Sequence, residues 1–220
     1  MRPAVPRSTM KAMSNGESTR TGGLVLCGGG SRRMGSPKYQ LRFGDETMLE
    51  RMVRLLSSVV SPVAVIASAG QELPALQPEV IVARDLYANA GPLAGLSAGL
   101  NALSHAVDAV YVTSCDSPFL QADFVRAVIS SLGTADMAIP RDRDHHHPLA
   151  AVYRTSLAPI VDRLLSEGIR RPVALLESVT VVEVDVAHLR LSDPDLRSLQ
   201  NMNTPNDYQD ALRAAGLLHP

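Results

Sequence analysis

A glycine cluster and two cations lie close together near the start of the chain. Residues 28–30 are all glycine, they follow the apolar run 24–26, and Arg33 and Lys38 come soon after them. Glycine lets backbone N–H groups approach a ligand closely, and such groups in a loop after a strand can bind anionic oxygens. The guanidinium adds a planar fork of donors and the ammonium adds a compact charge. This combination predicts a triphosphate site, whereas an exposed glycine-rich loop with incidental charge is the alternative.

Two aspartates occupy positions that suit the rest of a nucleotide. Asp116 follows the apolar run 109–113, and Pro118 turns the chain away. Such a carboxylate can hold Mg²⁺, which usually takes one or two carboxylates together with substrate phosphates. Asp85 follows the run 80–83, and its carboxylate can accept hydrogen bonds from the N1–H and N2–H₂ donors of guanine. The alternatives are an Asx turn for Asp116 and a solvated loop position for Asp85.

The histidines, cysteines and paired arginines of the chain give weaker evidence of a functional site. Three adjacent histidines at 145–147 point in different directions, so a flexible loop is favoured over a metal site. Cys27 and Cys115 end two predicted strands that can be neighbours, and small buried thiols are favoured over a redox pair. Arg170 and Arg171 either contact an anionic substrate or are exposed.

The apolar patterns predict the scaffold that positions these loops. Strands are expected at 24–26, 63–67, 80–83, 109–113, 137–140, 149–153 and, at an edge, 179–184. Helices are expected after Thr47, at 93–103, 123–132, 156–167 and 172–177, and after Thr204, with a short helical or irregular piece at 73–77. This alternation predicts a single-domain α/β fold, a doubly wound and mostly parallel sheet with helices on both faces. Ligands bind beyond the carboxyl ends of such strands, where the glycine loop, Asp85 and Asp116 are expected.

Composition and charge argue against several classes of protein. The net charge of -1 and an aromatic content of 4% argue against binding nucleic acid. No apolar run approaches the roughly 20 residues that cross a bilayer. Two cysteines among 220 residues form no disulfide framework, so a cytoplasmic location is expected. Residues 1–21 lack apolar periodicity and the apolar core of a secretory signal, so we expect a disordered tail before a domain at 22–220.

Four segments together resemble a known enzyme family. The loop LCGGGSRRMGSPK at 26–38 has neither the Gly-Lys-Ser/Thr ending of a Walker A loop nor the dinucleotide fingerprint. It resembles LxGGxSxRMGxxK, the signature of the nucleotidyltransferases that include the molybdenum cofactor guanylyltransferases, with Cys27 where the family usually has Ala. GPLAGL at 91–96, CDSPFL at 115–120 and NMNTPND at 201–207 also resemble family segments. The resemblance covers about residues 22–215.

The resemblance implies a Rossmann-like enzyme that transfers GMP from GTP to molybdenum-bound molybdopterin and releases pyrophosphate. Arg33, Lys38 and Asp116 would be catalytic, with Asp116 holding Mg²⁺ or alternatively Mn²⁺, and transient protein partners would deliver the pterin. The implied nucleotide-binding residues are Leu26, Cys27, Gly28, Gly29, Gly30, Ser31, Arg33, Gly35, Lys38, Asp85, Gly91, Pro92 and Asp116. The residues implied on the acceptor side are Pro148, Asn201 and Asn203.

One position departs from the family pattern. Gly70 stands where the guanylyltransferases often carry Asn, although the Gly-Pro-Leu segment at 91–93 looks more like the guanylyl than the cytidylyl branch. Transfer from CTP to molybdopterin, or from another NTP to a sugar phosphate, therefore remains an alternative with the same chemistry. A non-catalytic nucleotide-binding module that regulates a partner is the alternative of another class, but binding alone needs no metal-holding carboxylate.

Overall fold

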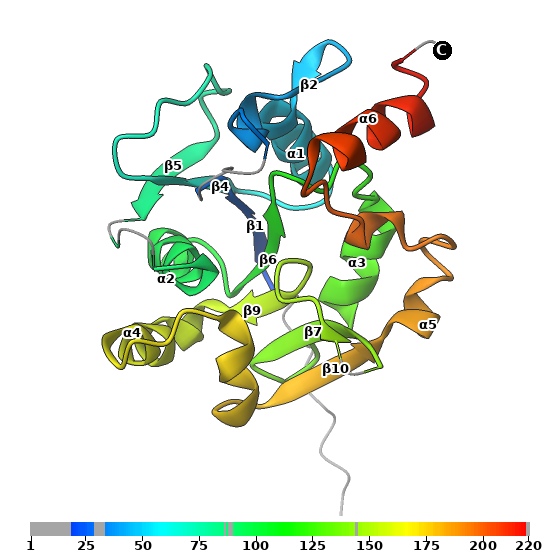
Figure 1. The fold of residues 1–220 in the computed structure, drawn as a ribbon. Helices are drawn as coiled ribbons and strands as arrows, with labels where there is room; N and C mark the ends of the chain where they lie inside the picture. The colour runs from blue at the N-terminus through cyan, green and yellow to red at the C-terminus, as the bar shows by residue number, and fades with distance from the viewer. Residues whose placement is uncertain (1–18, 29–33, 86, 88–89, 144, 219–220) are drawn as a thin grey trace, which may run out of the picture.

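The computed structural model describes residues 19–28, 34–85, 87, 90–143 and 145–218, and these form a sheet between two helical layers (Figure 1). The strands of this sheet are β1 (Thr21–Leu26), β4 (Val63–Ser68), β5 (Ile81–Asp85), β6 (Ala109–Ser114), β7 (Met137–Asp142), β8 (His145–His146), β9 (Val152–Arg154) and β10 (Val181–Asp185). Their order is β10-β7-β9-β6-β1-β4-β5, with β8 paired to β7. Only the pairs made by β8 and β9 are antiparallel among the described strands of this sheet. The predicted mostly parallel α/β sheet is confirmed.

Two of the six described α-helices begin at reciprocal side-chain caps. The six are α1 (Met48–Ser57), α2 (Pro92–Leu103), α3 (Ala122–Ser130), α4 (Ala158–Ser166), α5 (Val186–Leu189) and α6 (Pro205–Ala214). Before α1, the Thr47 hydroxyl accepts from the Glu50 N–H, and the Glu50 carboxylate accepts from the Thr47 N–H. Thr204 and Asp207 make the same reciprocal pair before α6. Each pair satisfies N–H groups that a helix leaves without partners, so the predicted helix starts after Thr47 and after Thr204 are confirmed.

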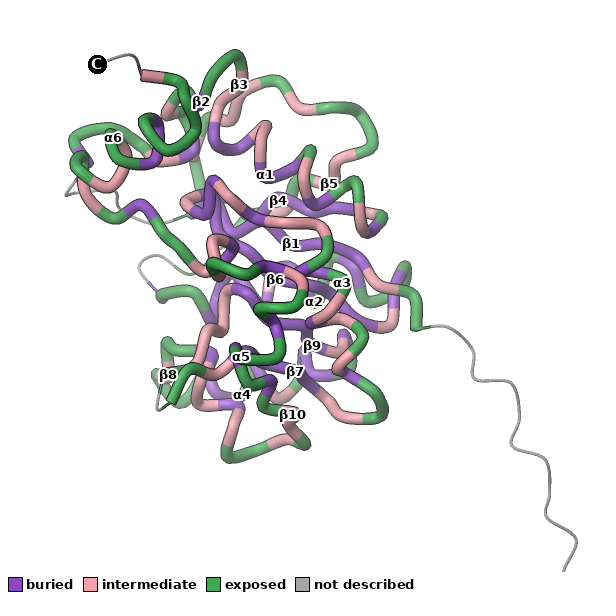
Figure 2. The backbone as a smooth tube through the Cα atoms, turned by 90° about the vertical axis from the view of Figure 1, so that its right-hand side faces the viewer, coloured by how far each residue is buried: buried purple, intermediate pink, exposed green. Residues whose placement is uncertain are grey.

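The two faces of the sheet bury separate hydrophobic clusters. Leu24 and Leu26 pack with residues of α2 and α4, whereas Val25 between them packs with residues of α1 and α3. This alternation follows from the period of two in a strand. A Cβ atom on Gly99 of α2 would lie 2.4 Å from Leu24 Cδ1, so the small residue allows α2 to approach the sheet closely. Figure 2 shows the resulting buried centre of β1, β4 and β6.

Several local predictions need correction. The histidines at 145–146 form β8 rather than a flexible loop, because β8 pairs with β7 and His146 Nε2 lies 2.6 Å from Glu183 Oε1 of β10. The strand predicted at 149–153 starts only at Val152, because the chain turns at 147–150 before it enters the sheet. Residues 172–177 form a helix of the 3₁₀ type. The piece at 73–77 is irregular, which is one of the two forms expected for it.

The folded domain also starts earlier than expected. Thr21 is the first residue of β1, and the backbone N–H and guanidinium of Arg20 donate to the Asp108 carboxylate. The predicted boundary between residues 21 and 22 is therefore too late, since a strand residue and an ion pair lie before it. Residues 1–18 of the predicted tail lie outside the described residues. No helix in the described part of the chain is long and apolar enough to cross a bilayer.

Candidate active site

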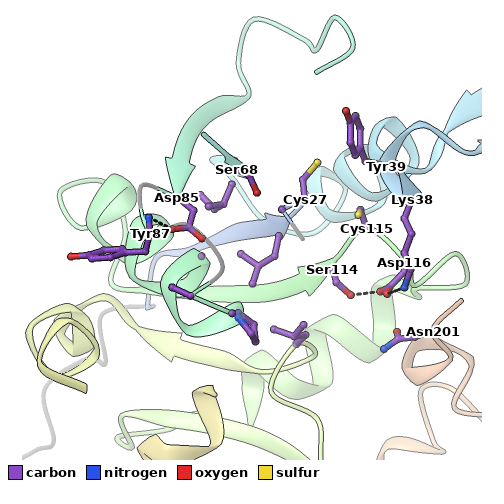
Figure 3. A pocket seen from close by; sticks show the side chains of 18 of the residues that line it. Cys27, Lys38, Tyr39, Ser68, Asp85, Tyr87, Ser114, Cys115, Asp116 and Asn201 are labelled. Atoms are coloured by element: carbon purple, nitrogen blue, oxygen red, sulfur yellow. Dashed lines mark hydrogen bonds and ion pairs between the residues drawn. The ribbon is translucent and has the colours of Figure 1, made fainter. Parts of the chain in front are cut away.

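A cavity of about 660 Å³ opens at the carboxyl ends of β1, β4, β5 and β6 (Figure 3). The strand register places these ends together, because Leu26 pairs with both Ile66 and Ser114, and Ser68 pairs with Asp85. The cavity is lined by Leu26, Cys27, Gly28, Lys38, Tyr39, Ile66, Ser68, Ala69, Asp85, Tyr87, Ala90, Gly91, Pro92, Gly95, Ser114, Cys115, Asp116, Leu149, Asn201 and Asn203.

An ion pair dominates one side of this cavity. Lys38 Nζ lies 2.8 Å from Asp116 Oδ2 and 3.0 Å from Asn203 Oδ1. The Ser114 hydroxyl donates to Asp116 Oδ1. The Lys38 and Asp116 side chains are only 18% and 14% exposed, so water screens this pair less than it screens a surface pair. A cation, a carboxylate and an amide therefore face one point in the cavity.

The chain after the Asp116 loop is tied to the segment before α6. The Met202 N–H donates to the Asp116 carbonyl at 2.9 Å, and the Ser117 hydroxyl donates to Asn201 Oδ1 at 2.7 Å. The Asn203 N–H donates to the Asp207 carboxylate, which also caps α6. The cap of α6 thus fixes Asn203 where its side chain can reach Lys38.

The opposite side of the cavity is built from strand ends and the start of α2. Figure 3 shows Asp85 and Ser68 on this side, away from Asp116. Asp85 Oδ1 accepts from the Tyr87 N–H at 2.8 Å, which leaves capacity on the carboxylate for another donor. Gly91 precedes α2 with φ 73, and a Cβ there would lie 2.8 Å from the Arg170 carbonyl oxygen. Only glycine fits this turn without strain.

Two thiols lie between the two sides. Cys27 and Cys115 directly follow the paired residues Leu26 and Ser114, so they end neighbouring strands as expected. Both are buried and free. A hydrogen bond from Cys115 lowers the pKa of Cys27, and the same contact, together with burial, raises the pKa of Cys115 well above its usual value. The expected pair of small buried thiols is confirmed.

The structure brings most of the predicted site residues to one cavity. Those that line it are Leu26, Cys27, Gly28, Lys38, Asp85, Gly91, Pro92, Asp116, Asn201 and Asn203. Gly29, Gly30, Ser31 and Arg33 lie outside the described residues. Gly35 and Pro148 are described and do not line the cavity; the Pro148 carbonyl accepts from the Tyr153 hydroxyl, and Leu149 lines the cavity instead.

Sequence reasoning left several lining residues out of the binding set. These are Tyr39, Ile66, Ser68, Ala69, Tyr87, Ala90, Gly95, Ser114, Cys115 and Leu149. Ser68 and Ser114 are the last residues of β4 and β6, so the rule that ligands bind at carboxyl ends of strands was a sufficient signal for them. The sequence offers no comparable signal for Leu149, which lies within the turn at 147–150.

The donor set around Asp116 fits a hard cation. Oxygen atoms of the Asp116 carboxylate and of the neighbouring Ser114 and Asn203 face the cavity, and Mg²⁺ prefers oxygen ligands. In the described part of the chain, no three His, Cys, Asp or Glu side chains form a group that could hold a metal. A metal on Asp116 would therefore complete its shell with substrate phosphates or water, as Mg²⁺ commonly does.

Comparisons with known proteins identify the family of this chain. Residues 23–182 match the family described as the MobA-like NTP transferase domain. A probable molybdenum cofactor guanylyltransferase of Mycobacterium bovis is 38% identical over 190 residues, which cover 83% of this chain and 88% of the relative. A molybdenum cofactor guanylyltransferase of Desulfosudis oleivorans is 30% identical over 191 residues, which cover 86% and 93%.

Solved structures share the fold. Molybdopterin-guanine dinucleotide biosynthesis protein A from Archaeoglobus fulgidus is similar with a TM-score of 0.74 and 26% identity, over 90% of this chain and all of that one. A 2-C-methyl-D-erythritol 4-phosphate cytidylyltransferase from Thermus thermophilus has the same fold, with a TM-score of 0.64 and 16% identity over 88% of this chain and 98% of that one. The chain therefore belongs to the MobA-like nucleotidyltransferases, the family of the molybdenum cofactor guanylyltransferases.

Proposed function

We propose that this protein transfers GMP from GTP to molybdenum-bound molybdopterin and releases pyrophosphate. The observation that carries the proposal is the placement of the Lys38–Asp116 pair and of Asp85 on two sides of one cavity at the strand ends. One side offers a cation and a metal-holding carboxylate for phosphates, and the other offers a carboxylate for the base. Relatives named as guanylyltransferases over most of the chain support the same reaction.

The chain's own groups would act by positioning and by charge. A terminal phosphate oxygen of the pterin attacks the α-phosphorus of GTP, and the bond from that phosphorus to the pyrophosphate leaving group breaks. Lys38 would move from Asp116 to the phosphates, since a triphosphate offers it more negative charge than one carboxylate does. No side chain needs to form a covalent bond with the substrate, so catalysis comes from orientation and from stabilising developing charge.

Asp116 is the residue that would hold the divalent ion. When bound there, Mg²⁺ supplies positive charge to the phosphates of the substrate, and Mn²⁺ is the alternative ion. Ser114 would keep the carboxylate oriented by donating to Oδ1. The departure of Lys38 would leave Oδ2 available for the metal.

Different residues would bind the guanine base of GTP and the pterin. Asp85 would accept hydrogen bonds from N1–H and N2–H₂ of guanine, next to the turn at Gly91. Asn201 and Asn203 would face the pterin, because they line the cavity on the side of Asp116. The reaction would take place in the cytoplasm, the compartment expected from the two unpaired thiols.

A nucleotide panel tests the proposal. With Mg²⁺ present, GTP should raise the melting temperature more than CTP, ATP or UTP; binding at a hundredfold excess over Kd adds about 2.7 kcal/mol. With molybdopterin added, GTP should also release pyrophosphate. An equal or larger shift with CTP would contradict the guanine assignment. Binding of GTP without any pyrophosphate release would favour the non-catalytic module.

A further inference from the structure

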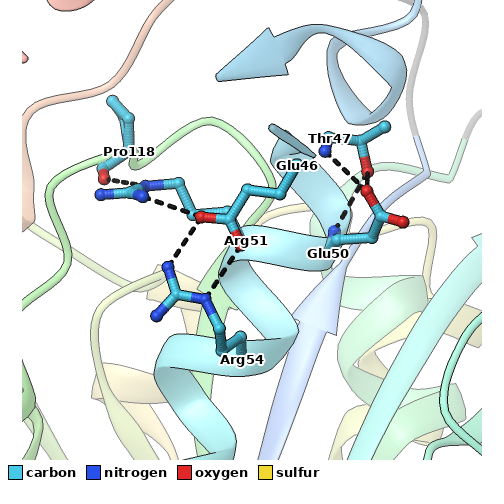
Figure 4. A network of polar contacts seen from close by, with 6 residues as sticks. All are labelled: Glu46, Thr47, Glu50, Arg51, Arg54 and Pro118. Carbon is cyan, nitrogen blue, oxygen red and sulfur yellow. Dashed lines mark hydrogen bonds and ion pairs between the residues drawn. The ribbon is translucent and has the colours of Figure 1, made fainter. Parts of the chain in front are cut away.

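Arg51 contacts the loop that presents Asp116, although it does not line the cavity. It lies on α1, and its Nε donates to the Pro118 carbonyl at 2.7 Å (Figure 4). Pro118 is two residues beyond Asp116 in the chain. Its carbonyl therefore belongs to the turn that leads the chain away from the carboxylate.

The guanidinium of Arg51 is itself held in place from two directions. Its Nη1 lies 2.9 Å from Glu46 Oε1 in β3 (Glu46–Thr47). Its Cζ lies 4.7 Å from the centre of the Phe43 ring in β2 (Arg42–Phe43). The planar fork of arginine can serve a carboxylate and a carbonyl together while its face packs on an aromatic ring.

Phe119, the residue after Pro118, makes further contacts that hold the same loop. The Phe119 ring packs edge-to-face against Phe43 with centres 5.9 Å apart, and Arg197 Cζ lies 3.7 Å from the centre of the Phe119 ring. Hairpin β2–β3, helix α1 and the loop after β6 thus form one connected stack. These contacts restrain the loop after β6.

Arg54 provides an internal contrast. It also lies on α1, and it binds the same carboxylate, with Nε 2.9 Å from Glu46 Oε2 and Nη2 2.7 Å from Oε1. Arg54 has no described contact with the loop after β6, and its side chain is 57% exposed against 22% for Arg51. Both arginines stabilise Glu46, but only Arg51 joins Glu46 to the Asp116 loop.

We propose that Arg51 is a positioning residue for the transfer reaction, acting through the Pro118 carbonyl to fix the Asp116 carboxylate for metal binding. The proposal rests on the proposed role of Asp116 as the metal ligand. Contacts with Glu46 and Phe43 orient the guanidinium of Arg51. Arg54 takes no part in positioning Asp116. A rigid carboxylate binds Mg²⁺ better, because Mg²⁺ demands near-ideal geometry.

The test compares Arg51→Met with Arg54→Met in the full chain. Turnover is measured against Mg²⁺ concentration at saturating GTP, and the GTP-induced rise in melting temperature is measured with and without Mg²⁺. For Arg51→Met we expect the Mg²⁺ concentration at half-maximal turnover to rise about tenfold, the range seen when a group that orients a metal ligand is removed. The Mg²⁺-dependent part of the thermal shift should shrink as well. Both quantities should stay unchanged for Arg54→Met.

Two results would overturn the proposal. The first is a Mg²⁺ dependence that is unchanged in Arg51→Met, even if the melting temperature falls, since that pattern marks a purely structural ion pair. The second is an equal change in both variants, which would assign the effect to Glu46. If Arg51→Met does not fold, Arg51→Lys takes its place: it keeps a charge beside Glu46 without the planar fork, and the same direction of change is expected.

Asp116→Asn separates this proposal from the proposed function. If that variant keeps a normal Mg²⁺ dependence, the assigned metal site is wrong and the role of Arg51 fails with it. If Asp116→Asn abolishes the Mg²⁺-dependent thermal shift while Arg51→Met leaves it intact, the metal site stands and only the positioning role fails.

Discussion

The two sides of the cavity are built in different ways. The side with Asp85, Ser68 and Gly91 consists of strand ends and a turn, and Asp85 Oδ1 accepts from the N–H of Tyr87, two residues further along the chain. The side with Lys38, Asp116 and Asn203 is assembled from three distant parts of the chain through side-chain contacts. Lys38 and Asp116 are 78 residues apart.

The proposed roles of the two sides would explain this difference. A planar base needs a fixed edge of donors and acceptors, which a rigid turn can present alone. Developing charge on phosphates needs several groups that converge from different directions. We therefore expect changes on the Asp116 side to alter turnover, and changes on the Asp85 side to alter nucleotide preference.

The largest effect is expected for Asp116→Asn. Removing the metal-holding charge should lower turnover by about 10³-fold, which corresponds to about 4 kcal/mol of transition-state stabilisation. The fold should persist, because the amide oxygen can still accept from Lys38 and the amide NH₂ can donate to the hydroxyl oxygen of Ser114. Metal-free GTP affinity should stay the same or increase, since a negative charge near the triphosphate is gone. Turnover, melting temperature and metal-free Kd on this one variant provide the check; normal turnover would refute the metal assignment.

A smaller and different effect is expected for Asp85→Asn. The amide places a donor against the N1–H of guanine, so about 1.5–3 kcal/mol of charge-assisted hydrogen bonding is lost. GTP affinity should fall by roughly 10- to 100-fold. Turnover at saturating GTP should change little, because the phosphate side is intact. Calorimetric titration with GTP and CTP tests this: CTP affinity should be unchanged, and an equal loss for both would show that Asp85 supports the cavity rather than the base.

The smallest effect is expected for Gly70→Asn, which introduces the residue that the guanylyltransferases often carry at this position. Gly70 has φ 71, a region that Asn tolerates, and nothing lies within 4 Å of the position of its Cβ. Stability should fall by less than the roughly 1–2 kcal/mol that this backbone region costs most L-residues, because Asn adopts it more readily than they do. If the new amide reaches the nucleotide, one added hydrogen bond would tighten GTP binding by about 0.5–1.5 kcal/mol. An unchanged Kd would show that the base pocket ends at Ala69.

The sequence alone predicted most of the long strands and helices and the local parts of the site. The alternation of apolar strands and amphipathic helices predicted the sheet, and the caps at Thr47 and Thr204 predicted two helix starts, because these signals act within a few residues. The positions of Asp85 and Asp116 after strands followed from the same patterns. Even the neighbouring thiols of Cys27 and Cys115 could be anticipated, since each ends a buried strand.

Only the tertiary structure decided which groups meet. The contact between Lys38 and Asn203, the support of the Asp116 loop by Arg51, and the antiparallel insertion of β9 between β6 and β7 all depend on strand order. Periodicity assigns residues to elements and faces, but it contains no information about which elements become neighbours. Chain segments far apart in sequence pack together through the combined burial of both faces of the sheet, and that packing placed the charged groups of this cavity around one point.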